Sequence, residues 1–184
     1  MKPSWRVHGI FSKGGDKPNI VPAEAELWYY VRAPTTSEVN ALLHKVENCF
    51  KSAATALDCT VEISYGTRYK NVISNRTLGT IYRNYLAASG EPVTDEKTHP
   101  ISRGSTDFGD VSHVTPGIHP FFYIHTNATA HSIEFNSAAN TTQALTSTFN
   151  VATCLTKTIV DVFSDSSLLD DIKRDFADQL QEEA

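Results

Sequence analysis

Residues 23–57, AEAELWYYVRAPTTSEVNALLHKVENCFKSAATAL, place a strand pattern directly before a helix pattern, and they decide the fold class of the chain. In the first part, from residue 23 to 32, apolar and polar residues alternate, and successive side chains of a strand point to opposite faces. One face would carry Ala25, Leu27, Tyr29 and Val31, and the other Glu24, Glu26, Trp28, Tyr30 and Arg32. This alternation predicts a half-buried antiparallel strand.

The second part opens with a helix start signal. In residues 35–38, TTSE, the Thr35 hydroxyl and the Glu38 carboxylate can each accept a hydrogen bond from a backbone N–H of the first turn. The apolar residues behind it fall at helical spacing and form one stripe: Val39, Leu42, Leu43, Val46, Cys49, Phe50, Ala53 and Leu57. A long amphipathic helix is therefore predicted here.

Further strand patterns flank this core. Residues 5–11 alternate and run into a glycine turn, and residues 59–65 alternate behind the helix. Together they predict a β-β-α-β unit over residues 3–66, with a three-stranded antiparallel sheet backed by one helix.

The rest of the chain is mainly helical in pattern. Apolar spacing predicts a helix around Leu78–Leu86 that ends at Gly90. A longer helix is predicted over residues 142–163, with these residues facing inward: Leu145, Phe149, Ala152, Leu155, Ile159, Val160 and Phe163. A closing amphipathic helix follows a break at residues 164–167 and carries Leu168, Leu169, Ile172, Phe176 and Leu180.

Between these helices, residues 104–139 hold most of the groups capable of chemistry. The apolar run 120–124 predicts a buried strand that delivers polar side chains to a site. Four histidines recur every six residues at His113, His119, His125 and His131, but proline and glycine interrupt the stretch, so we interpret the spacing as accidental.

Two residues near the N-terminus allow two interpretations each. Asn19 follows a turn and suits an Asx-turn, and Arg32 ends a strand and suits a surface ion pair. As a functional pair they would offer an amide donor and a planar guanidinium, the groups that hold a carboxylate or polarise an amide carbonyl.

Composition excludes several classes of function. The chain has 184 residues, 40% of them hydrophobic, and a net charge of -5, which makes nucleic acid an unsuitable partner. Its three widely spaced cysteines suggest neither a disulfide framework nor a thiolate zinc site. No run is long enough to span a membrane and the start resembles no signal peptide, so we expect a cytoplasmic protein.

Several motifs resemble one enzyme family. RVHGIF at residues 6–11, KPNIVP at 17–22 and YYVRAP at 29–34, followed by the capped helix, resemble the lid (dimerisation) domain of metallopeptidase family 20, the aminoacylase and glutamate-carboxypeptidase type of di-zinc amidohydrolase. Residues 104–124 and 130–139 resemble the C-terminal part of its catalytic domain, in the branch that includes the aminobenzoyl-glutamate hydrolases.

The resemblance implies a fold and a reaction. Residues 3–66 would be an incomplete α+β lid, through which a homodimer would form, and residues 67–184 the C-terminal part of an α/β/α catalytic domain, with a hinge near residues 66–70. The reaction would be amide hydrolysis of a dipeptide or an N-acyl amino acid at two zinc ions, with manganese or cobalt as alternatives.

The resemblance also implies roles for residues. His131 would be a metal ligand, Asn19 and Arg32 would grip the substrate carbonyl and carboxylate, Gly104 and Ser105 would lie in a substrate-facing turn, and Asp107 would orient its neighbours.

The remaining ligands of the family, a His-x-Asp pair and a Glu-Glu pair, have no counterpart here, and we assign no catalytic residue to this chain. A di-zinc site needs about five ligands, so we expect the chain alone to be inactive. Alternatives are a non-catalytic remnant that pairs through its lid with a full-length relative, and a fragment without a stable fold.

Overall fold

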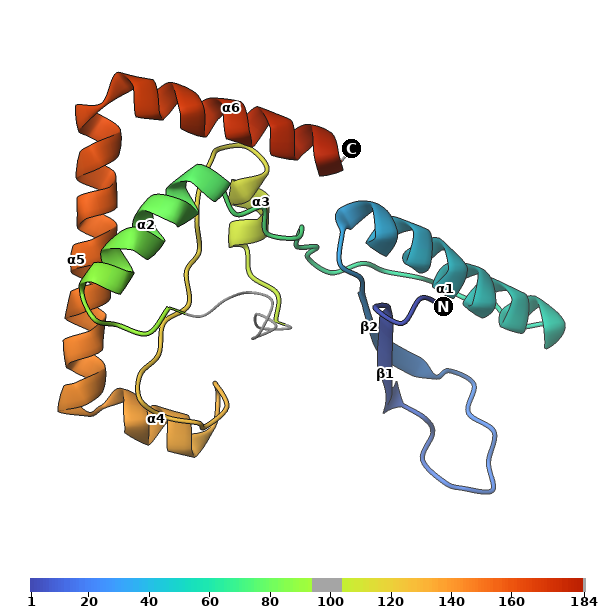
Figure 1. The fold of residues 1–184 in the computed structure, drawn as a ribbon. Helices are drawn as coiled ribbons and strands as arrows, with labels where there is room; N and C mark the ends of the chain where they lie inside the picture. Colours follow the sequence, from blue (N-terminus) through green and yellow to red (C-terminus); the bar gives the residue numbers. More distant parts are fainter. Residues whose placement is uncertain (94–103, 184) are drawn as a thin grey trace. The chain divides into compact units, whose positions relative to one another are not determined.

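The computed structural model describes residues 1–93 and 104–183, which form two compact units (Figure 1). The first comprises residues 1–71 with Glu183, and the second residues 72–182. The elements of the described residues are, in chain order, β1 (Arg6–Lys13), β2 (Glu26–Arg32), α1 (Thr36–Ala56), α2 (Arg76–Ala88), α3 (Phe108–Ser112), α4 (Ile133–Ala139), α5 (Thr142–Ser164) and α6 (Ser166–Glu183). Within those residues every helix is too short or too polar to cross a membrane.

In the first unit, β1 and β2 pair antiparallel, as their alternation predicts, and α1 packs on β2. The Tyr29 ring lies edge-on to Phe50 of α1, with 5.2 Å between the ring centroids. Its cross-strand partner is Gly9, where a Cβ atom would lie only 2.3 Å from the Tyr29 ring. The ring can therefore lie over β1 only because residue 9 has no side chain.

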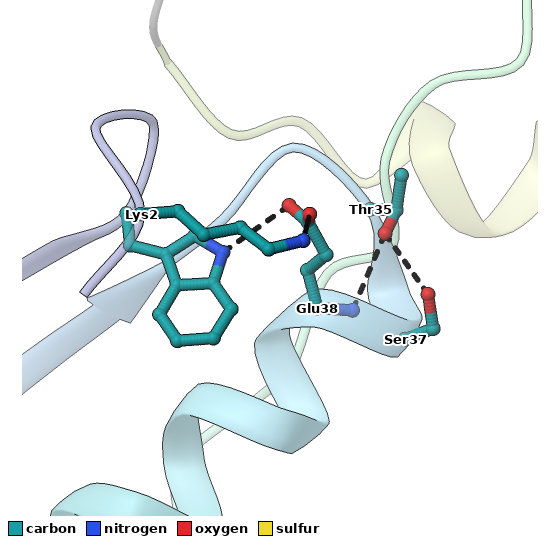
Figure 2. Close-up of polar contacts among 5 residues, drawn as sticks. Lys2, Thr35, Ser37 and Glu38 are labelled. Atoms are coloured by element: carbon teal, nitrogen blue, oxygen red, sulfur yellow. Dashed lines mark hydrogen bonds and ion pairs between the residues drawn. The ribbon is translucent and has the colours of Figure 1, made fainter.

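The predicted capping box at the start of α1 is half correct. Thr35 Oγ1 accepts a hydrogen bond from the Glu38 backbone N–H at 3.2 Å, as expected of an N-cap. The Glu38 carboxylate does not return to the cap; it pairs with Lys2 and accepts from Trp5 Nε1 at 3.2 Å (Figure 2). A cation and an indole N–H outcompete the local backbone donor, so Glu38 ties the N-terminal residues to α1.

The apolar stripe of α1 is narrower than its spacing predicts. Leu42 is 1% exposed and forms the centre of the packed face. Val39, Leu43, Val46 and Phe50 are half-buried, but Cys49, Ala53 and Leu57 are exposed. A sheet of two strands covers only the first turns of a 21-residue helix, which leaves its C-terminal end in solvent.

The third strand predicted over residues 59–65 is wrong. This segment forms no ladder, and the sheet has two strands within the described residues. Val61 and Tyr65 are exposed, and Tyr65 Oη donates to Glu47 of α1 at 2.5 Å. Alternation makes a segment suitable for a strand, but a strand also needs an edge to pair with, and here the side chain contacts a helix instead.

In the second unit, the core lies between α2 and α5. Tyr82 and Leu86 of α2 pack against Val151 and Cys154 of α5, and half-buried residues surround them: Tyr85, Ile118 and Leu155. α2 spans the predicted helix and ends as predicted, because Gly90 adopts a φ of 80° just beyond its C-terminus.

Asn75 joins three segments of this unit. It is buried and caps α2 by accepting from the Leu78 N–H at 3.0 Å. Its Nδ2 donates to the Ile172 carbonyl of α6 at 3.0 Å, and its backbone N–H donates to the Gly117 carbonyl at 2.9 Å. α6 itself covers the longer part of the predicted closing helix, with Ile172 buried and its other predicted inward residues half-buried.

α5 exists where predicted, but the inward face assigned to it is wrong. The buried residues of the helix are instead small or polar: Ala144, Ser147, Val151, Cys154 and Thr158. Of the predicted inward residues, Leu155 is half-buried and the others are exposed, with Phe149 at 65% and Phe163 at 87%. Small side chains let α2 approach closely, so the larger apolar residues lie on the uncovered side.

Part of that uncovered side is a groove of about 300 Å³. Its walls are apolar and come from α2, α5 and residue 118: Leu78, Ile118, Leu155, Thr158, Ile159, Val162 and Phe163.

The buried strand predicted at residues 120–124 is also wrong. These residues have no strand partner within the described part of the chain, and Phe121, Phe122 and Tyr123 are exposed. An apolar run of this length is buried only if neighbouring strands cover it, and none does so here.

Candidate functional site

The turn at residues 104–107 leads into the short helix α3. Gly104, Ser105 and Asp107 are exposed, and Thr106 Oγ1 accepts from the Phe108 N–H at 3.3 Å. Asp107 begins α3 without a side-chain capping bond. Its carboxylate therefore faces solvent next to the turn, where a ligand can reach it.

α3 is fixed to the unit by Ser112. This residue is fully buried; its Oγ donates to the Gly109 carbonyl at 2.8 Å and accepts from the Ile73 N–H at 3.0 Å. The turn at residues 104–107 thus precedes a firmly held helix.

The four evenly spaced histidines have different surroundings. His113 is half-buried at the C-terminus of α3, and His119 stacks on Phe108 with ring centroids 5.1 Å apart. His125 contacts α5, and His131 is exposed in a turn. Across residues 1–93 and 104–183, no three His, Cys, Asp or Glu side chains gather to hold a metal ion.

His131, the predicted metal ligand, lies immediately before α4. Its φ is 71°, in the left-handed region, and the next residue, Ser132, caps α4 by accepting from the Phe135 N–H at 3.1 Å. The Ser132 N–H donates to the Thr129 carbonyl at 3.1 Å. The imidazole is thus presented from a strained turn against a helix start.

Asn19 and Arg32 lie toward opposite ends of the hairpin. Arg32 pairs with Arg6 at one end, whereas Asn19 belongs to the loop that follows Lys13 at the other and projects beyond the strands (Figure 1). β2 spans about 20 Å between these ends. The structure therefore does not bring the predicted pair together.

Arg32 ends a row of exposed aromatic side chains on one face of β2. Its guanidinium lies 5.4 Å from the centre of the Tyr30 ring, and the Trp28 and Tyr30 rings are 6.1 Å apart. Planar stacking of this kind restricts the guanidinium and presents its edge.

One polar network was missed by sequence reasoning. Glu91, His125 and Ser147 are hydrogen-bonded although they lie far apart in the chain. Only Gly90, the helix-ending glycine before Glu91, gave a local signal that the chain turns there. Which partner Glu91 would meet depended on tertiary packing.

Comparison with known proteins identifies related chains. Residues 6–57 match the model of the peptidase dimerisation domain, which corresponds to β1, β2 and α1. The Xaa-Arg dipeptidases of Mus musculus and Homo sapiens are each 45% identical over 185 residues, which is 100% of this chain and 43% and 42% of those proteins.

A third relative is more distant. A p-aminobenzoyl-glutamate hydrolase of Escherichia coli (strain K12) is 34% identical over 88 residues, 47% of this chain and 18% of that protein. The chain thus spans less than half the length of each of these relatives.

Proposed function

The chain belongs to metallopeptidase family 20, and we propose that it is part of a metal-dependent amide hydrolase acting on a dipeptide or an N-acyl amino acid. The observation that carries this proposal is the 45% identity to Xaa-Arg dipeptidases along the whole chain. The relatives' name describes a dipeptide with a C-terminal arginine, and we take this as the first substrate to test.

The described residues do not by themselves fit a catalytic zinc site. His131 offers one exposed imidazole, whereas catalytic zinc needs three protein ligands. We therefore derive no hydrolytic step from this chain alone and propose that it is inactive by itself. In the proposed full site His131 supplies one nitrogen ligand, and the metal polarises the amide and activates water.

Arg32 is the residue we propose for the substrate carboxylate. Its planar guanidinium, stacked against Tyr30, suits bidentate binding of a carboxylate. A dipeptide extends only about 7 Å, so Asn19 at the other end of the hairpin does not reach the same molecule from this position. Asn19, Gly104, Ser105 and Asp107 remain proposals for contacts to other parts of the substrate.

A chimera tests this function. The aligned 43% of the mouse Xaa-Arg dipeptidase is replaced by this chain, and release of arginine from Xaa-Arg dipeptides is measured with zinc or manganese added. We expect turnover in the chimera, loss of turnover in His131→Ala, and a raised KM with little change in kcat in Arg32→Ala.

Two controls sharpen the result. Arg6→Ala removes the arginine that pairs across the hairpin from Arg32 and should leave KM unchanged. His44→Ala removes an exposed histidine of α1 and should leave turnover unchanged. Turnover by the 184-residue chain alone that His131→Ala abolishes would overturn the proposal of inactivity, and an inactive, folded chimera would overturn the hydrolase assignment.

A second role is favoured by the dimerisation domain. Residues 6–57 match it, and a sheet of two strands leaves edges that can pair with another chain. We propose that this region forms a homodimer or pairs with a full-length relative. Sedimentation equilibrium of the 184-residue chain, alone and with the mouse enzyme, would give the monomer mass in both cases if the proposal is wrong.

A further inference from the structure

A chain of hydrogen bonds links three separate segments of the second unit. His125 Nε2 lies 3.0 Å from Ser147 Oγ, and Ser147 Oγ donates to Glu91 Oε2 at 3.1 Å. Asn150, one turn further along α5, donates from Nδ2 to Glu91 Oε1 at 2.8 Å. Both Glu91 oxygens are thus occupied by α5, and His125 is attached to α5 through Ser147.

The direction of these bonds fixes the state of the His125 ring. A carboxylate only accepts hydrogen bonds, so the single proton of Ser147 is directed to Glu91. Ser147 Oγ must then accept from His125, which requires a proton on Nε2. Ser147 is 2% exposed, so water does not compete for these bonds.

The His125 to Ser147 bond closes a ring of chain around His131. From Ser147 the ring runs back through the start of α5 and α4 to His131, and then through residues 126–130 to His125. Within it the Ala128 N–H donates to Thr126 Oγ1 at 3.1 Å. Closing a short segment at both ends reduces the conformations open to it.

Backbone strain at both histidines points the same way. His125 has a φ of 60° and His131 a φ of 71°, conformations that side chains other than glycine rarely adopt. Such residues persist where the surrounding structure holds them. For His125 that holding interaction is the bond to Ser147.

We propose that His125 is a positioning residue: through Ser147 and Glu91 it ties the segment that carries His131 to α5 and so holds the metal ligand in place. The consequence for the metal rests on the proposed function, whereas the tie itself can be tested without it.

The tie is tested by NMR on the 184-residue chain. Ring nitrogen shifts should show His125 protonated at Nε2. Ser147→Ala and His125→Gly remove the same bond from opposite sides, and glycine adds no strain at a positive φ. Both should speed exchange of the Ala128 and Ser132 amides about fivefold or more, while the Leu78 amide in the cap of α2 stays unchanged.

The consequence is tested in the chimera by competing its metal away with a chelator. Ser147→Ala should lower metal retention with an unchanged melting temperature, and Thr148→Ala, at the next and exposed position of α5, should not. A His125 ring protonated only at Nδ1, or unchanged exchange in Ser147→Ala, overturns the tie. Faster exchange with unchanged metal retention overturns the positioning role, and a chimera that never retains metal overturns the proposed function instead.

Discussion

The buried hydroxyl of Tyr82 leads to a prediction that runs against the usual effect of core substitutions. Tyr82 is 6% exposed and packs in the core between α2 and α5, yet its Oη has no hydrogen-bond partner among the described residues. Burial raises the pKa of Tyr82, in keeping with a phenol that lacks a polar environment. A buried hydroxyl without a partner costs folding free energy.

Tyr82→Phe should therefore stabilise the chain. Leaving a buried polar group unsatisfied costs about 1–3 kcal/mol, and the small void left by the hydroxyl returns part of this, so we expect a gain of about 1 kcal/mol. For a chain of this size the melting temperature should rise by about 2–4 °C. Urea unfolding and thermal melting followed by circular dichroism at neutral pH measure both quantities.

Tyr85→Phe is the matched control on the same helix. Tyr85 Oη donates to Asp161 Oδ2 at 2.7 Å, and this bond raises the pKa of Tyr85. Removing that hydroxyl should lower the melting temperature, opposite in sign to Tyr82→Phe. If Tyr82→Phe lowers stability as well, the Tyr82 hydroxyl has a partner in solution and the reasoning is refuted.

Three further predictions concern the rest of the fold. The hydrogen bond from Lys2 lowers the pKa of Glu38 below its ordinary value of 4.5, so the stability it contributes is present above pH 4.5 and lost as pH falls through the folded value; Lys2→Met should reduce that loss in thermal melts below pH 4.5. Leu86→Ala in the core should cost about 2–5 kcal/mol in urea unfolding, whereas Phe149→Ala on the exposed side of α5 should change stability by less than about 0.5 kcal/mol and reduce self-association in light scattering. Gly9→Ala should cost about 1–3 kcal/mol, because the new Cβ would meet the Tyr29 ring, and Tyr29→Leu in the same chain should recover part of the loss.

The elements that could be predicted from sequence are those specified by local chemistry. Thr35 and Gly90 bound α1 and α2 through bonds and dihedral angles within a few residues. The hairpin of β1 and β2 is also local, since its strands are joined by one loop. The segments at 59–65 and 120–124 were mistaken for strands because alternation and apolarity do not reveal whether a pairing edge exists.

The candidate site was predictable only in part for the same reason. His131 was found through its resemblance to a family motif, and its place before Ser132 at the start of α4 follows from a local cap. The bonds that join His125 to Ser147 and Glu91 span 22 and 56 residues of sequence. A serine within a helix pattern and a glutamate after a helix carry no signal that they meet.

α5 shows why periodicity predicts amphipathicity better than burial. Its large apolar residues do share one side, as their spacing indicates, but the core of the second unit lies against its small residues instead. Exposed apolar surface of this extent, next to a groove with apolar walls, is unusual in a self-sufficient domain. The chain spans 43% of the mouse relative, so the helical pattern reflects more burial than the described residues provide. The contrast between Leu86→Ala and Phe149→Ala measures that difference directly: equal losses of stability would mean that the exposed side of α5 is already packed in solution.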